Sequence, residues 1–243
     1  MPRKSIKSFT KLSVLIPVYN EQNTVEKLVK LVVAVSLKRF RIEKELIIVD
    51  DCSTDNTRKI LKKLEKKYKD VKIYFHKKNS GKGAAIKTAI RHATGEIMIV
   101  QDADLEYDPN DYLACIEPII KGKALVVYGS RRLKLNQNQY SGVSYYIGGV
   151  FITWFFVLLY WQHITDEPTC YKTFRSDVIR KIRIVGDRFE WEPEVTAKIA
   201  KQGIKILEVP ISYHPRHVAE GKKIRWKDGV QAVYTLLKYR FMN

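Results

Sequence analysis

The segment Leu46-Ile47-Ile48-Val49-Asp50-Asp51 indicates the fold class, because an apolar run of strand length ends directly in two carboxylates. A cluster of helix-capping residues, Ser53 to Thr57, follows it and precedes a helical pattern formed by Ile60, Leu61 and Leu64. A buried strand, a polar loop and an amphipathic helix in succession are typical of one unit of an α/β sheet.

The same alternation continues on both sides of this segment. Four further apolar runs are predicted as strands: Val14–Val18, Val71–Phe75, Ile97–Val100 and Ala124–Tyr128. Helical patterns lie between them, for example over residues 25–33 and 84–93. Continuous apolar strands joined by helices predict a doubly wound, Rossmann-like, mostly parallel sheet covered on both faces. We see no repeat or linker, and predict a single domain over residues 1–243, with halves at about 1–130 and 131–243.

Composition limits the partners. The 243 residues carry 44 Lys plus Arg against 26 Asp plus Glu, a net charge of +18 that favours an anionic partner or surface. The three cysteines, Cys52, Cys115 and Cys170, lack metal-ligand spacing, and the first eleven residues lack the apolar core of a signal peptide. We therefore expect a reduced, cytoplasmic protein without a disulfide framework or zinc site.

Polar clusters fall where the predicted strands end. Asn20 and Glu21 follow the first strand, Asp51 the second, and Asp102-Ala103-Asp104 the fourth, with Glu106 two residues further on. Ligands of open α/β sheets bind beyond the carboxyl ends of the strands. Paired carboxylates there are suited to Mg²⁺ or Mn²⁺, which are commonly shared with substrate phosphates. A solvated acidic turn is the alternative.

The turn Asn79-Ser80-Gly81-Lys82-Gly83-Ala84-Ala85 is rich in glycine and carries one lysine. It lacks the spacing of a phosphate-binding P-loop, which argues against a kinase or a P-loop ATPase. Two interpretations of this turn remain: Lys82 contacts the substrate, or the turn only connects a strand to a helix.

Taken together, these motifs resemble those of the family 2 glycosyltransferases. Residues 14–21 are similar to the opening nucleotide-binding strand of that family, and residues 50–57 to its D-D-x-S-x-D-x-T element. Residues 79–85 resemble its N-x-G-K-G-x-A turn, and residues 102–105 its metal-binding D-A-D-L motif. The order and spacing agree over about the first 130 residues, and the resemblance implies a GT-A fold and a nucleoside-diphosphate sugar donor.

Segments of the second half resemble the polyprenyl-phosphate hexosyltransferases of the dolichyl-phosphate mannose or glucose synthase type: residues 129–131, 189–194 and 216–223. This resemblance implies roles for individual residues. Pro17, Tyr19, Asn20, Glu21, Val49 and Asp51 are expected to hold the nucleoside, with Lys82 as a further donor contact. Asp102, Ala103, Asp104 and Glu106 are expected around the metal and diphosphate, with Asp102, Asp104 and Glu106 as ligands. Arg131, Arg216 and Lys222 are expected to meet phosphate groups of the donor and of a lipid-phosphate acceptor.

The chemistry of transfer agrees with these roles. Negative charge develops on the departing diphosphate, where a divalent ion and basic side chains stabilise it. A hydroxyl acceptor needs a general base, for which Glu190 and Glu192 are the main candidates, with Glu194 beside them. A lipid phosphate is already anionic and needs no base, in which case these glutamates orient the sugar or cap a helix through residues 195–200.

The stretch from Leu135 to Thr165 contains no Asp, Glu, Lys or Arg, and its densest part is Tyr145–Trp161. A membrane span there would separate motifs that share one active site, so a buried core helix and a helix in the headgroup region remain. The C-terminal pattern places Trp226, Val230, Val233, Tyr234, Leu236 and Leu237 toward one side of a basic helix. We expect peripheral binding to the anionic inner face of the membrane, with a separate membrane subunit as a further candidate partner. The alternative is that Val230, Val233 and Leu237 pack on the domain.

The resemblance implies an inverting transferase that moves a hexose from a donor of the GDP-mannose or UDP-glucose type to a polyprenyl phosphate. Three other functions are weighed against it. A related transferase would use a saccharide or protein hydroxyl. A nucleic-acid-binding protein would explain the positive charge, but the sequence has no recognition motif of that class, so we expect no nucleic-acid partner. An inactive sugar-binding module is disfavoured because both aspartates of the D-x-D pair are present.

Overall fold

The computed structural model describes residues 9–133, 142–216 and 226–242. Its strands are β1 (Lys11–Val18), β2 (Glu43–Asp50), β3 (Val71–Phe75), β4 (Ile97–Val100), β5 (Val126–Ser130), β6 (Lys172–Arg175) and β7 (Ile206–Pro210). Its α-helices are α1 (Val25–Ala34), α2 (Thr57–Lys67), α3 (Lys82–His92), α4 (Tyr112–Ile120), α5 (Val143–Tyr160), α6 (Ser176–Ile179), α7 (Trp191–Lys201) and α8 (Trp226–Phe241), with 3-10 turns at Lys38–Phe40 and Pro109–Asp111.

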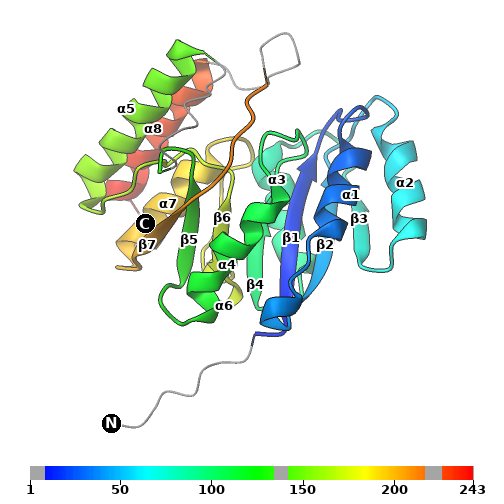
Figure 1. Ribbon diagram of the computed structural model, residues 1–243. Coiled ribbons are helices and arrows are strands. Elements are labelled where there is room, and N and C mark those ends of the chain that lie inside the picture. The colour runs from blue at the N-terminus through cyan, green and yellow to red at the C-terminus, as the bar shows by residue number, and fades with distance from the viewer. Residues whose placement is uncertain (1–8, 134–141, 217–225, 243) are drawn as a thin grey trace.

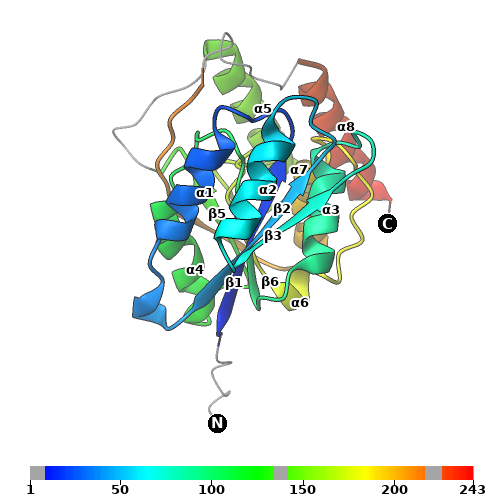
Figure 2. The ribbon, with the colours of Figure 1, turned by 90° about the vertical axis from the view of Figure 1, so that its right-hand side faces the viewer.

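The strands form one seven-stranded sheet in the order β3-β2-β1-β4-β6-β5-β7 (Figure 1). All neighbouring strands run parallel except β6, which is antiparallel to both β4 and β5. Helices cover both faces, with α1 and α4 on one side and α3 and α7 on the other (Figure 2). The predicted mixed α/β class with a mostly parallel sheet is confirmed.

Burial explains why the central strands are continuous apolar runs. All four side chains of β4 are buried, and β1 is buried from Leu12 to Ile16. Fully burying a valine, leucine or isoleucine stabilises a fold by about 1.5–3 kcal/mol. The centre of the sheet is therefore a rigid base for the loops that leave its carboxyl edge.

Strand β6 was not predicted, because Lys172 and Arg175 interrupt its apolar pattern. Lys172 is nevertheless fully buried; its Nζ donates to the carbonyl of Glu167 at 2.6 Å and lies 4.0 Å from the centre of the Tyr128 ring. The second half of the chain thus contributes β6 and β7 to the same sheet as the first half.

Helices α5 and α8 pack side by side beyond α7 (Figure 1), and the Tyr160 hydroxyl donates to the Leu236 carbonyl at 2.7 Å. Only Thr153 and Phe156 of α5 are buried, so the core-helix interpretation of this stretch is wrong. Among the described helices, α5 is long and apolar enough to cross a bilayer, and 17% of it is buried.

The exposed apolar side chains of α5 recur at helical spacings of three and four residues and form one stripe: Val143, Tyr146, Ile147, Val150, Phe151, Trp154 and Leu158, with Trp161 directly after the helix. Helix α8 carries a second stripe with Trp226, Val230, Tyr234 and Leu237 exposed, whereas Leu236 is buried. The predicted apolar residues of α8 therefore do not share one side. The packing alternative fails for Val230 and Leu237, which are exposed, whereas Val233 is half-buried.

Candidate active site

The candidate site lies at the carboxyl edge of the sheet, between β1 and β4. We call this region, around Glu21, Lys82, Asp102, Asp104 and Arg216, the crevice, after the usual ligand position in open α/β sheets. Strands β2 and β3 lie on one side of β1, and β4 lies on its other side, so the strand order reverses at this point. Open α/β sheets bind ligands where the strand order reverses. Three residues other than glycine have positive φ in the loops at this edge: Asn20 (51°), Cys52 (63°) and Leu105 (65°). Such backbone conformations cost energy and concentrate at functional sites.

The loops after β1 and β2 hold each other in place. The Asn20 backbone N–H donates to Ser53 Oγ at 2.9 Å, and Asn20 Oδ1 accepts from the Thr54 N–H at 2.8 Å. The Glu21 N–H donates to Thr57 Oγ1 at 2.9 Å. The two conformationally strained loops are thus a preassembled wall of the crevice.

Asp51 fixes the glycine-rich turn that begins α3. Its carboxylate accepts from the backbone N–H of Ser80 at 2.9 Å and of Gly81 at 2.6 Å. His76 Nδ1 lies 2.7 Å from Asp51 Oδ1. Because only 5% of the Asp51 side chain is exposed, most of its hydrogen-bonding capacity serves the turn.

Lys82, the first residue of α3, joins two carboxylates at the crevice. Its Nζ is 2.8 Å from Asp102 and 2.7 Å from Glu192. Burial lowers the pKa of Lys82, but the two carboxylates outweigh this effect and hold the pKa well above its usual value. A permanently charged ammonium therefore stands beside the first aspartate of the D-x-D pair.

Arg216 has the corresponding place beside the second aspartate. Its guanidinium lies 3.3 Å from Asp104 and 3.2 Å from Glu21. Burial, Asp102 and Glu106 raise the pKa of Asp104 to about 7, although Arg216 acts in the opposite direction. Negative charge is thus concentrated in a partly desolvated position, where an additional cation is favourable.

The predicted group of three carboxylate ligands, Asp102, Asp104 and Glu106, is not assembled. No group of three or more His, Cys, Asp or Glu side chains able to hold a metal ion occurs in the described part of the chain. Glu106 is instead used internally, since it accepts from the Tyr213 hydroxyl at 2.9 Å and from the Arg216 N–H at 2.8 Å. Two carboxylates remain that a divalent ion could share with a diphosphate, and hard oxygen donors fit Mg²⁺ or Mn²⁺.

Arg131 is committed to a partner that the sequence did not predict. Its Nε and Nη2 each donate to Asp166 at 2.7 Å, and its backbone N–H donates to the same carboxylate at 2.9 Å. The guanidinium also lies 5.0 Å from the centre of the Tyr213 ring. Arg131 thus orients the end of β5. Its predicted contact with a phosphate group would use the N–H groups of the guanidinium that do not donate to Asp166.

The three glutamates around α7 have different environments. Glu192 is 8% exposed and reaches Lys82, so it belongs to the crevice. Glu190 accepts from the backbone N–H groups of Asp187 and Arg188, at 3.1 and 3.2 Å. Glu194 is fully buried and accepts from the backbone of Val185 and Gly186 at 2.8 and 2.7 Å. Glu190 and Glu194 therefore brace the loop before α7.

The remaining predicted donor residues differ in access. Pro17 is half-buried and opposes Val49 in the register of β1 and β2, whereas the Val49 side chain is fully buried. Val49 can thus meet a ligand through its backbone only. Tyr19 is half-buried and Ala103 is 4% exposed. Lys222 lies outside the described residues.

Several residues at or behind the crevice were missed by sequence reasoning. Asp166, Tyr213 and His76 lie 25 to 107 residues from the side chains that they bind, so no local spacing marks them. Arg132 was also missed, although it is adjacent to Arg131. Its Nη1 donates to the Thr165 carbonyl at 2.6 Å, and its guanidinium lies 5.7 Å from the centre of the Tyr146 ring on α5.

Comparison with known proteins agrees with this geometry. The model of the family described as glycosyl transferase family 2 matches residues 13–183. The chain belongs to glycosyl transferase family 2. The match covers the crevice from the first strand through β6 and stops before α7, so Glu192 and Arg216 lie beyond it.

Relatives of this family 2 glycosyltransferase cover nearly all of its length. A UDP-N-acetylglucosamine–dolichyl-phosphate N-acetylglucosaminyltransferase of Methanococcus voltae is 29% identical over 92% of this chain and 93% of its own. An uncharacterized protein of Methanocaldococcus jannaschii is 26% identical over 94% of this chain and 99% of its own.

Solved structures share the fold of this glycosyltransferase. Glucosyl-3-phosphoglycerate synthase from Mycobacterium tuberculosis, in complex with Mn²⁺, UDP and phosphoglyceric acid, has a TM-score of 0.70 at 16% identity, over 97% of this chain and 80% of its own. A mannosyltransferase from Pyrobaculum calidifontis, in complex with GDP-Man and Mn²⁺, has a TM-score of 0.57 at 21% identity, over 82% of this chain and 54% of its own. The predicted GT-A fold is confirmed by these neighbours.

Proposed function

We propose that this glycosyltransferase moves a sugar from a nucleoside-diphosphate donor to a polyprenyl or dolichyl phosphate, at the cytoplasmic face of a membrane. The observation that carries the proposal is the exposed apolar stripe of α5 next to the charged crevice. Arg132 connects the two, because it follows Arg131 at the end of β5 and lies against Tyr146 of α5. A soluble acceptor would not need an apolar surface of this kind beside the site.

The donor would lie across the β1–β4 crevice. The preassembled loops after β1 and β2, with Pro17, Tyr19, Asn20, Glu21 and the backbone of Val49, would form the nucleoside side. The turn held by Asp51 would bring Lys82 to the diphosphate. The Methanococcus voltae relative, named for UDP-N-acetylglucosamine, makes that donor the first to test, ahead of the predicted UDP-glucose and GDP-mannose.

Asp102 and Asp104 would hold a divalent ion together with the donor diphosphate. The bound ion would stabilise the negative charge that develops on the leaving group. Mn²⁺ in the two neighbouring structures supports this arrangement without distinguishing Mn²⁺ from Mg²⁺. Lys82 and Arg216 now neutralise these aspartates, and both would turn toward diphosphate oxygens when the donor binds.

A lipid phosphate would attack the anomeric carbon in one displacement with inversion. It is already an anion, so no proton has to be removed from it. Arg216, Arg132 and the free donors of Arg131 would orient the acceptor phosphate, and the predicted contact of Lys222 would add to them. Glu192, held by Lys82 at 2.7 Å, would hold a hydroxyl of the transferred sugar.

The placement of Glu192 also keeps a second function open, transfer to a saccharide or protein hydroxyl with Glu192 as general base. The Glu192→Gln variant separates the two. A loss of rate of about 100-fold or more with normal donor binding indicates a base, since general bases contribute typically 10²–10⁴-fold. Activity within about tenfold of the wild type supports the phosphate acceptor.

The direct test uses vesicles with and without dolichyl phosphate, one nucleotide sugar at a time, and Mn²⁺ or Mg²⁺. We expect radiolabelled sugar to enter the lipid phase only when dolichyl phosphate and a divalent ion are both present. Asp102→Asn should lower the rate at least about 100-fold, and Asp70→Asn, at an exposed residue just before β3, should not. Transfer to water or to a soluble sugar alone would contradict the proposed acceptor.

Membrane binding is tested separately by flotation with anionic vesicles at low and high salt. Trp154 and Leu158 are 57% and 55% exposed, so replacing both with glutamate should leave the thermal midpoint unchanged. The double variant is expected to lose flotation, because apolar burial and attraction to anionic lipids act together. A wild-type protein that stays in the soluble fraction at low salt would contradict the peripheral location.

A further inference from the structure

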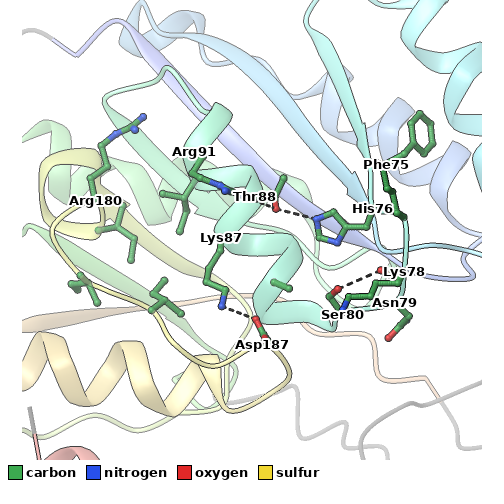
Figure 3. Close-up of a pocket in the computed structure, with 16 residues that line it drawn as sticks. Phe75, His76, Lys78, Asn79, Ser80, Lys87, Thr88, Arg91, Arg180 and Asp187 are labelled. Carbon is green, nitrogen blue, oxygen red and sulfur yellow. Dashed lines mark hydrogen bonds and ion pairs between the residues drawn. The ribbon is translucent and has the colours of Figure 1, made fainter.

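A continuous chain of hydrogen bonds runs from helix α3 to the carboxyl end of β2. Arg91 Nη2 donates to Thr88 Oγ1 at 3.0 Å, and Thr88 Oγ1 lies 3.0 Å from His76 Nε2. His76 Nδ1 then lies 2.7 Å from Asp51 Oδ1. Figure 3 shows the imidazole between the α3 side chains and the turn at Ser80, on the wall of a cavity of about 900 Å³.

The arrangement of donors and acceptors gives this series of hydrogen bonds one direction. A neutral imidazole has one N–H and one acceptor nitrogen. The carboxylate of Asp51 accepts only, which places the ring hydrogen on Nδ1 and makes Nε2 the acceptor of the Thr88 hydroxyl hydrogen. Thr88 Oγ1 in turn accepts from Arg91. In the neutral ring both imidazole nitrogens are then hydrogen-bonded, which fixes the ring in position and tautomer.

Asp51 transmits this order to the crevice. The carboxylate fixed by His76 also accepts from the N–H groups of Ser80 and Gly81. Gly81 has φ = 103°, and a Cβ on it would clash with the Asp187 carbonyl oxygen, so the turn tolerates little displacement. Lys82 follows directly and contacts Asp102 and Glu192.

We propose that His76 is a positioning residue for donor binding, which acts on the nucleotide sugar through Asp51 and the turn 79–81. It touches neither the donor nor the reacting atoms. This inference rests on the proposed function for its consequence in donor binding, and on the structure alone for the order of the turn. Because it sets where the donor is held, its loss should weaken binding and leave the chemical step intact.

Two variants of nearly equal size provide the test. His76→Asn keeps an amide N–H at the same number of bonds from the backbone as Nδ1, whereas His76→Leu removes the hydrogen bond. The adjacent cavity gives both side chains room. We expect His76→Leu to raise the donor KM about tenfold, the scale seen when a group that orients a ligand contact is lost, with kcat within about twofold. His76→Asn should restore most of the affinity.

Hydrogen exchange gives a measurement that does not depend on activity. The amides of Ser80 and Gly81 should exchange faster in His76→Leu than in the wild type, and at nearly the wild-type rate in His76→Asn. Equal protection in all three proteins, or a donor KM that is the same in both variants, would overturn the inference. A wild type that binds no nucleotide sugar refutes the proposed function instead, and the exchange comparison still decides the role of His76.

Discussion

Replacing Asp166 with alanine is expected to destabilise the fold by about 3–5 kcal/mol. Asp166 is fully buried, and its carboxylate accepts three N–H groups of Arg131 at 2.7–2.9 Å. Burial raises the pKa of Asp166, but Arg131 outweighs it and lowers that pKa, so the carboxylate is charged. Without this partner, the guanidinium of Arg131, 17% exposed, would stay buried and uncompensated.

The size of this stability loss reflects the difference between removing one member of a buried ion pair and removing both. Deleting one member of a buried ion pair leaves an unpaired charge, whereas replacing both with apolar residues is often neutral or stabilising. Arg131→Leu combined with Asp166→Leu should therefore recover most of the lost stability. Asp177→Ala, which breaks the partly exposed pair with Arg175, should cost no more than about 1 kcal/mol.

The assay is equilibrium unfolding in urea at pH 7, with the slope of the transition compared between variants. Equal slopes with a shifted midpoint report a change in stability alone. A loss of less than about 1 kcal/mol for Asp166→Ala, similar to that of Asp177→Ala, would refute the reasoning. A double variant no more stable than Asp166→Ala would likewise show that the unpaired charge is not the cause.

Three further changes test the remaining framework. Burial raises the pKa of Glu45, but hydrogen bonds from Thr94, Ser13 and Lys72 lower it from 4.5 to about 2. Above pH about 4.5, the wild type should therefore be more stable than Glu45→Gln by on the order of 3 kcal/mol. This difference in stability should disappear as the pH falls toward 2. Urea unfolding at pH 7, 4 and 3 measures it, and a difference independent of pH would count against the Glu45 network. Gly83→Ala should destabilise strongly, because its Cβ would meet the Gly186 carbonyl oxygen at 2.5 Å and Trp191 Cβ at 2.9 Å; a thermal midpoint equal to the wild type would disprove this packing. Gly148→Ala in α5 has open space around the new Cβ and should stabilise by about 0.5–1 kcal/mol, so a lower midpoint would contradict the helix there.

Sequence reasoning succeeded where local patterns are sufficient. Strands β3 and β4 have the predicted bounds, and β1 and β2 extend the predicted runs by a few residues toward their amino ends. Continuous apolar runs mark buried parallel strands without any tertiary information. The carboxyl ends of parallel strands meet at one edge of a sheet, and there Arg216 joins Glu21 to Asp104 while Lys82 pairs with Asp102. Their roles in donor and metal binding stay predictions.

The features that the sequence did not predict depend on contacts between residues far apart in the chain. The bonds of Glu106 to Tyr213 and of Arg131 to Asp166 join residues 107 and 35 positions apart, and no local spacing reveals them. A short antiparallel strand with a buried lysine, β6, violates the apolar pattern because its charge is satisfied by neighbours in the sheet. Exposure of α5 likewise could not be read from its composition, which is the same for a core helix and an interfacial one.

The most direct measurement of the central claim is calorimetric titration of the purified protein with UDP-N-acetylglucosamine, UDP-glucose and GDP-mannose, with and without Mn²⁺. We predict that at least one of them binds, that Mn²⁺ is required, and that Asp104→Asn weakens the affinity at least about tenfold at unchanged thermal stability. Binding of none of the three nucleotide sugars by the wild type, or equal affinity in Asp104→Asn, would contradict the account.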